Sequence, residues 1–176
     1  MTIDKIILEE RFTTHQKISL ILYIGAPFIV SIFYLSISII DLNIKGYLML
    51  TILILIYGFI ILLSFSKKGF LKIKSNLYRG LFFRDKLIFR KRIDLKDRPK
   101  ISILKFRKTQ KLAFFSAARP DLATEFNSFE INILNDKHTK REEIVTLRNI
   151  RNAENTIDFL ELNFELKNEI FSPDFR

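Results

Sequence analysis

The chain has 176 residues, of which 18 are phenylalanine, and it contains no cysteine and no tryptophan. The lack of cysteine excludes a disulfide scaffold, a thiolate metal site and a cysteine nucleophile. The chain carries 29 Lys and Arg against 19 Asp and Glu, a net charge of +10, yet 48% of its residues are hydrophobic. This combination excludes a disordered polyelectrolyte and is unusual for an ordinary soluble domain.

Residues 1–17 carry three basic and three acidic side chains, so this N-terminal segment is net neutral. Apolar residues at Ile3, Ile6, Ile7 and Phe12 indicate a short interfacial helix, whereas the alternation of Ile3, Lys5 and Ile7 indicates a strand, and the pattern leaves both open. A cleaved signal peptide needs a positive start and a short apolar core. This segment is net neutral and the apolar run after it is too long, so we expect no cleavage.

Two uncharged stretches follow, at residues 18–40 and 46–65. As helices they would be about 35 Å and 30 Å long, against a hydrocarbon core of about 30 Å. A hairpin buried inside a soluble protein is the alternative, but the remaining chain is too short to cover two helices that are apolar on every side. We predict an antiparallel transmembrane hairpin over residues 18–65, following a cytoplasmic segment at 1–17.

The hairpin has a predicted orientation and a predicted irregularity. Lys45 is the only base in the connecting turn, whereas a dense basic cluster follows the second span, so we expect both termini in the cytoplasm of a multi-pass inner-membrane protein. Pro27 removes a backbone donor and should kink the first span. Small residues that could allow helix contact are Gly25, Ala26, Ser31 and Ser38.

Residues 66–176 are predicted to form a cytoplasmic β-domain that ends in a helix. Apolar residues alternate with polar ones in about seven short runs, at 71–74, 77–83, 87–95, 101–104, 112–115, 129–133 and 144–147. Arg98 and Pro99 interrupt the series. We predict an α+β protein in which an antiparallel sheet curls into a partial barrel, because seven flat strands would expose their edges.

The last helix is predicted from an apolar stripe at Ala153, Ile157, Leu160 and Phe164, with Asn152 as its N-cap. We expect this helix to cover one open end of the sheet. The tail from Phe171 is expected to be irregular.

Charge is the strongest functional signal. Residues 67–111 hold 17 Lys and Arg against three acids, whereas residues 112–176 hold eight bases and twelve acids. A base near an anionic cytoplasmic leaflet gains about 1 kcal/mol. The bases could also serve only topology and solubility, which is compatible with lipid contact. The expected headgroup contacts are Lys67, Lys68, Lys72, Lys74, Arg90 and Arg92.

Other functions have weaker support. The basic strands lack an aromatic nucleic-acid motif, so we expect no nucleic-acid partner. His15 and His138 have no partner at metal or triad spacing, and no phosphate-binding loop occurs, so we expect a non-enzymatic protein without metal or cofactor. His138 is expected to be solvated in a polar turn. The long loop 116–128 is a candidate functional loop, with Arg119, Asp121 and Glu125.

The order of elements over residues 18–166 resembles the bacterial pleckstrin-homology-like membrane proteins, with residues 86–95 and 127–134 similar to strands of such a domain. The resemblance implies a lipid-facing or interaction module that binds a protein partner or itself and has no catalytic residues. The chain also resembles the membrane-anchored minimal β-barrel effectors of anti-phage signalling, which implies a nucleotide ligand and a pore-forming output. A third interpretation is an accessory subunit of a larger membrane complex.

Overall fold

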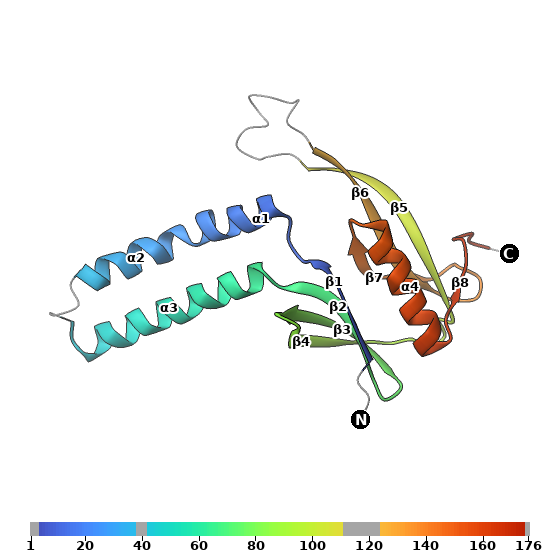
Figure 1. Ribbon diagram of the computed structural model, residues 1–176, viewed down its shortest axis with the longest axis horizontal. Coiled ribbons are helices and arrows are strands. Elements are labelled where there is room, and N and C mark those ends of the chain that lie inside the picture. The colour runs from blue at the N-terminus through green and yellow to red at the C-terminus, as the bar shows by residue number, and fades with distance from the viewer. Residues whose placement is uncertain (1–3, 38–41, 111–123, 175–176) are drawn as a thin grey trace. The chain divides into compact units, whose positions relative to one another are not determined.

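The computed structural model describes residues 4–37, 42–110 and 124–174 (Figure 1). This part of the chain is α+β, with two four-stranded sheets and a C-terminal helix. It divides into two compact units. The helical unit consists of Glu10–Lys68 and Leu81–Phe89, and the β-rich unit consists of Met1–Glu9, Gly69–Gly80 and Arg90–Arg176.

The helical unit is built around two helical segments that pack side by side (Figure 1). The first segment continues from α1 through a π-helix to α2, and the second is α3. The rings of Phe28 and Tyr57 stack between them, with centroids 6.3 Å apart. The bounds are α1 Thr14–Ser19, η1 Leu20–Ile24, α2 Ala26–Ile37 and α3 Ile44–Ser64.

The first segment bends by 44° between Ile24 and Ala26, which confirms the predicted kink. Pro27 falls in the first turn of α2, where a missing N–H is tolerated, and its ring prevents the preceding helix from continuing straight. At Gly25 a Cβ would lie 2.0 Å from the carbonyl oxygen of Ile21 and 2.5 Å from Cε2 of Tyr57. Glycine therefore allows both the bend and the close approach of the helices, whereas Ser38 lies outside the described residues.

Helix α3 is long and apolar enough to cross a membrane, and only 6% of its most apolar window is buried. The segments Thr14–Ile24 and Ala26–Ile37 are long and apolar enough to cross a membrane only when the bent pair is counted as one span. By length and composition, the described residues thus contain one candidate span, or two with the bent pair. The sequence predicted two spans with a kink in the first, and of these two only α3 reaches the length and hydropathy of a span as a single helix.

The first sheet has the strand order β1-β2-β3-β4. Residues 4–10 form a strand, so the helical interpretation of the N-terminal segment is wrong. Two-residue turns connect β2 to β3 and β3 to β4; in the second, Arg84 and Asp85 both have left-handed φ angles, of 45° and 62°. Two successive left-handed residues give the turn whose twist suits a hairpin. The bounds are β1 Asp4–Glu10, β2 Lys67–Ile73, β3 Asn76–Phe83 and β4 Lys86–Ile93.

The second sheet has the order β7-β6-β5-β8. Strands β5 and β6 are antiparallel from Lys100↔Leu134 to Gln110↔Thr124, and β8 joins β5 in parallel. The bounds are β5 Lys100–Gln110, β6 Thr124–Leu134, β7 Arg141–Leu147 and β8 Lys167–Asn168.

The described strands form two sheets in place of the single curled sheet that the sequence predicted. The chain leaves β4 after Ile93 and passes through Asp97, whose φ is 60°, and Pro99, which cannot donate a ladder hydrogen bond. This break lets β5 pair with β6 and β8. The predicted strand at 112–115 and residues 116–123 of the predicted loop lie outside the described residues, and residues 124–128 of that loop belong to β6.

Helix α4, Ile150–Phe164, lies against the second sheet (Figure 1). The predicted stripe is confirmed, because Ala153, Ile157 and Leu160 are buried and Phe164 packs on the same core. The predicted cap is wrong: Asn149, with extended backbone, accepts the hydrogen bond from the Arg151 N–H. The core joins strand and helix residues, including Leu8, Phe70, Leu77, Ile101, Phe129, Ile131, Ile133, Ile144 and Leu147.

A carboxylate from the N-terminal strand also reaches the start of α4. Glu9 accepts hydrogen bonds from the backbone N–H of Arg148 at 2.9 Å and of Asn149 at 3.2 Å, and its carboxylate lies 3.3 Å from Nε of Arg148. These N–H groups precede the helix, where the helix dipole also favours a negative charge. Glu9 thereby ties β1 to the β7–α4 junction within the β-rich unit.

Candidate functional site

The end of the helical unit at which α1 begins and α3 ends carries a fixed cation. Lys17 is buried, its Nζ lies 2.6 Å from Oε2 of Glu10, and the same Nζ lies 4.9 Å from the ring centroid of Phe65. The N–H of Arg11 also donates to the carbonyl of Ser66 at 2.9 Å. The chain entering the first helical segment and the chain leaving the second are therefore joined at one end of the pair.

The first two predicted headgroup residues belong to this end. Lys67 is exposed and Lys68 is half-buried, and both follow within four residues of the last residue of α3, Ser64. Before them, the hydroxyl of Ser66 donates to the carbonyl of Leu63 at 2.7 Å, which continues the helix end. The helix thus passes directly into cationic strand residues.

The other four predicted contacts lie in the β-rich unit, and they do not share one face. The Lys72 ammonium lies 5.7 Å from the ring centroid of Phe164, which packs on the core. The Arg90 guanidinium lies 5.3 Å from the ring of Tyr78. Tyr78 follows the core residue Leu77 in β3, so its side chain points to the opposite face.

By the same alternation Arg92 shares the face of Arg90, and exposed Lys74 lies in the turn after β2 with a φ of 57°. The basic region of the sequence is therefore divided between both faces and the turn. Strand periodicity could have predicted this division, because residues one apart in a strand point to opposite sides.

Most of the candidate functional loop, 116–128, lies outside the described residues. Arg119 and Asp121 lie outside the described residues, as does the side chain of Glu125. The backbone of Glu125 is in β6, opposite Thr109 of β5.

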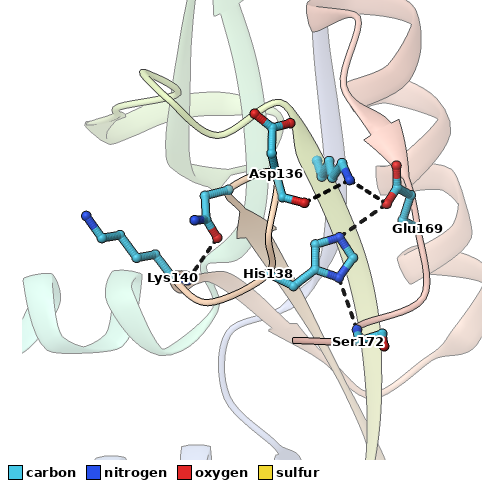
Figure 2. Close-up of polar contacts among 7 residues, drawn as sticks. Asp136, His138, Lys140, Glu169 and Ser172 are labelled. Carbon is cyan, nitrogen blue, oxygen red and sulfur yellow. Dashed lines mark hydrogen bonds and ion pairs between the residues drawn. The ribbon is translucent and has the colours of Figure 1, made fainter. Parts of the chain in front are cut away.

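A polar cluster that the sequence did not predict surrounds His138 (Figure 2). The expectation of a solvated histidine is wrong, because His138 is only 6% exposed. Its Nδ1 accepts a hydrogen bond from the backbone N–H of Ser172 at 3.0 Å, and its Nε2 lies 3.2 Å from Oε2 of Glu169 (Figure 2). Since Nδ1 is an acceptor, Nε2 carries the proton and donates it to the carboxylate.

Lys100 completes this cluster from β5. Its Nζ lies 2.8 Å from Oε2 of Glu169 and donates to the backbone carbonyl of Asp136 at 3.0 Å. The hydrogen bond from Lys100 is the main cause that holds the pKa of Glu169 below its usual range, with a further contribution from His138. One carboxylate oxygen thus joins the strand β5, the turn between β6 and β7, and the C-terminal segment.

Aromatic packing fixes the same C-terminal segment. The rings of His138 and Phe171 are nearly parallel with centroids 6.2 Å apart, and the Arg141 guanidinium lies 5.6 Å from the Phe171 ring. The N–H of Asp174 donates to the carbonyl of Lys137 at 2.9 Å. The tail is irregular, as predicted, but it is held in place, and the aromatic residue Phe171 is the signal in the sequence that could have indicated this.

The cluster is suited to structure more than to catalysis. Both ring nitrogens of His138 have partners in the protein, so neither offers a lone pair or a proton to a substrate. Among residues 4–37, 42–110 and 124–174, no group of three or more His, Cys, Asp or Glu side chains could hold a metal ion. The contacts of His138 and Lys100 hold residues 169–174 against the second sheet, and we call this cluster the C-terminal latch.

No known protein family, curated protein or solved structure matches this chain.

Proposed function

We propose that this chain is a membrane-anchored, non-enzymatic interaction protein. The helical unit would insert in the cytoplasmic membrane as a two-helix hairpin with both termini in the cytoplasm. The β-rich unit, of the pleckstrin-homology-like type, would face the anionic headgroups with part of its basic surface. Its acidic C-terminal part would bind a protein partner or a second copy of the chain.

The observation that carries this proposal is the exposure of α3. A helix in a water-soluble domain hides its apolar side chains against a core, yet 94% of the most apolar window of α3 is not buried. A helix of 21 residues is about 32 Å long, which matches the hydrocarbon thickness of about 30 Å. Exposure of so many apolar side chains is favourable in lipid and unfavourable in water.

The residues beyond the helix support contact with headgroups. Lys67 follows Ser64, the last residue of α3, by three positions, and the exposed Lys74 lies at the other end of β2, about 23 Å away along the strand. Each base near an anionic leaflet would contribute about 1 kcal/mol, decaying within about 8 Å at physiological salt. Because Lys72 and Arg90 lie on opposite faces of the sheet, we propose that Lys67 and Lys68 make the closest contacts, and that β2 lies along the leaflet so that Lys74 at its other end reaches the headgroups as well.

Insertion and orientation can be tested with the full chain, which has no native cysteine that would react with thiol reagents. The protein is expected in the membrane fraction after carbonate washing. A Lys45→Cys variant should react with an impermeant thiol reagent in intact spheroplasts, and an Asp174→Cys variant only after permeabilisation. Recovery of the full chain in the washed supernatant would refute the proposal.

Headgroup contact needs a separate measurement. A fluorescent probe at Ser75→Cys, in full-length protein in nanodiscs, should be quenched by headgroup nitroxide lipids when phosphatidylglycerol is present, and less so near 1 M salt, where the Debye length falls to about 3 Å. The double change Lys67→Glu and Lys74→Glu should abolish this quenching. Lys167→Glu, an exposed change in β8, is the matched control.

A further inference from the structure

The tip of the β3–β4 hairpin, Phe83–Phe89, is a surface that the proposed function does not use. The segment Leu81–Phe89 belongs to the helical unit, together with the apolar helices. Its turn is the two-residue hairpin of Arg84 and Asp85, so the tip is short and stiff. It can therefore present side chains in a fixed geometry.

The tip exposes an unusual run of apolar side chains. Leu87, Ile88 and Phe89 are 40%, 36% and 60% exposed. Strand neighbours point to opposite faces, so the run places apolar groups on both sides of the strand. Since β4 ends the strand order of its sheet, these residues also lie on an edge strand.

Positive charge surrounds the apolar run. Arg84 and Lys86 precede it, and the Arg84 guanidinium lies 5.7 Å from the ring of Phe83. Arg90, Lys91 and Arg92 follow it, all exposed. Over residues 84–92 five cations stand against Asp85 alone, a net charge of +4.

Edge protection is the structural alternative, since lysine and arginine on an edge strand prevent pairing with other sheets. That role explains the cations but not the apolar side chains, because an exposed apolar edge promotes the association that such charges prevent. Apolar side chains flanked by Lys and Arg suit the boundary between acyl chains and anionic headgroups. Of the possible occupants, an anionic bilayer surface complements both features.

We propose that this tip inserts into the anionic interface, with Leu87, Ile88 and Phe89 at the level of the upper acyl chains and Arg84 and Lys86 at the phosphates. The inference rests on the proposed function, because it assumes that the helices of the same unit span the bilayer. The tip would then be a second attachment of the helical unit, distinct from the spans.

The test uses full-length protein in nanodiscs of phosphatidylcholine and phosphatidylglycerol that contain acyl-chain nitroxide lipid. A probe at Ile88→Cys should be quenched several-fold more than a probe at Leu162→Cys, an exposed apolar position on α4. Adding Phe89→Thr, which keeps a strand-forming residue, or Arg84→Glu with Lys86→Glu, should reduce the quenching at residue 88. Leu162→Gln should leave it unchanged.

A probe at Leu55→Cys in α3 separates the two proposals. Quenching at residue 55 without quenching at residue 88 would overturn the tip proposal and leave the membrane anchor standing. Absence of quenching at residue 55 would overturn the anchor and the tip proposal with it. Concentration-dependent shielding of residue 88 in lipid-free detergent would assign the surface to a second copy and overturn lipid binding.

Discussion

Helices α3 and α4 differ in how much of their apolar surface the rest of the described chain covers. Three residues of the stripe on α4 are buried against the second sheet, while the charged residues Glu154, Asp158 and Glu161 are exposed. On α3 apolar side chains point in every direction, and within this helix only Leu50 and Ser64 are buried. The amphipathic helix packs its apolar face on a core, whereas the uniformly apolar helix leaves most of its surface uncovered, and in the function that we propose lipid covers it.

The largest effect is expected where α4 meets the core. Leu160→Ala should lower the free energy of unfolding of the β-rich unit by about 2–5 kcal/mol, because a fully buried leucine leaves a cavity. Reduced hydrogen-exchange protection of α4 and β6 measures the loss. Leu162→Ala, two residues along the same helix and 84% exposed, should have almost no effect. Equal losses at both positions would contradict the burial pattern.

An introduced charge is expected to have its effect on α3 and not on α4. Leu55→Arg places a guanidinium near the middle of α3, where membrane insertion becomes less favourable by about 3 kcal/mol. The carbonate-resistant fraction of the protein should fall. Leu162→Arg on α4 is the matched control and should leave the fraction unchanged. If both variants remained fully in the membrane fraction, α3 would not lie in the hydrocarbon core.

The sequence predicted both helices, because an uncharged run and a stripe with spacings of three and four residues are local patterns. It also predicted most strands by their alternation. The division into two sheets depends on which strands pair across the chain, and the alternation of β4 and β5 does not contain that information. The same limit applies to the site: Lys100, His138 and Glu169 lie far apart in sequence, and only folding brings them together.

A smaller effect is expected at the bend of the first helical segment. Gly25→Ala should weaken the packing of the two segments by about 1–3 kcal/mol, because the new methyl group would overlap the Ile21 carbonyl and the Tyr57 ring. Denaturation by SDS, followed by circular dichroism, measures the change. Gly58→Ala on α3 is the control, since no atom lies within 4 Å of its new Cβ. Equal sensitivity at both glycines would show that the close approach has no energetic role.

The smallest effect is expected from acid at the C-terminal latch. Because the pKa of Glu169 is lowered in the folded protein, its carboxylate contributes stability above its ordinary pKa, and this contribution is lost as the pH falls through the lowered value. A fluorescent probe at Asp174→Cys should lose anisotropy over that acid range while α4 stays folded. Adding Glu169→Gln should remove the transition, and an unchanged transition would assign it to another group.

Glu9 has a consequence for the order of events during synthesis. Its partners in the β7–α4 junction lie 139 and 140 residues later in the chain, so every strand from β1 to β7 must leave the ribosome before the contact can form. Contacts of such large sequence separation form late. If the helices enter the bilayer as they emerge, β1 can pair with β2 early, but the Glu9 carboxylate must wait for the β7–α4 junction, and the β-rich unit closes only after the helices are inserted.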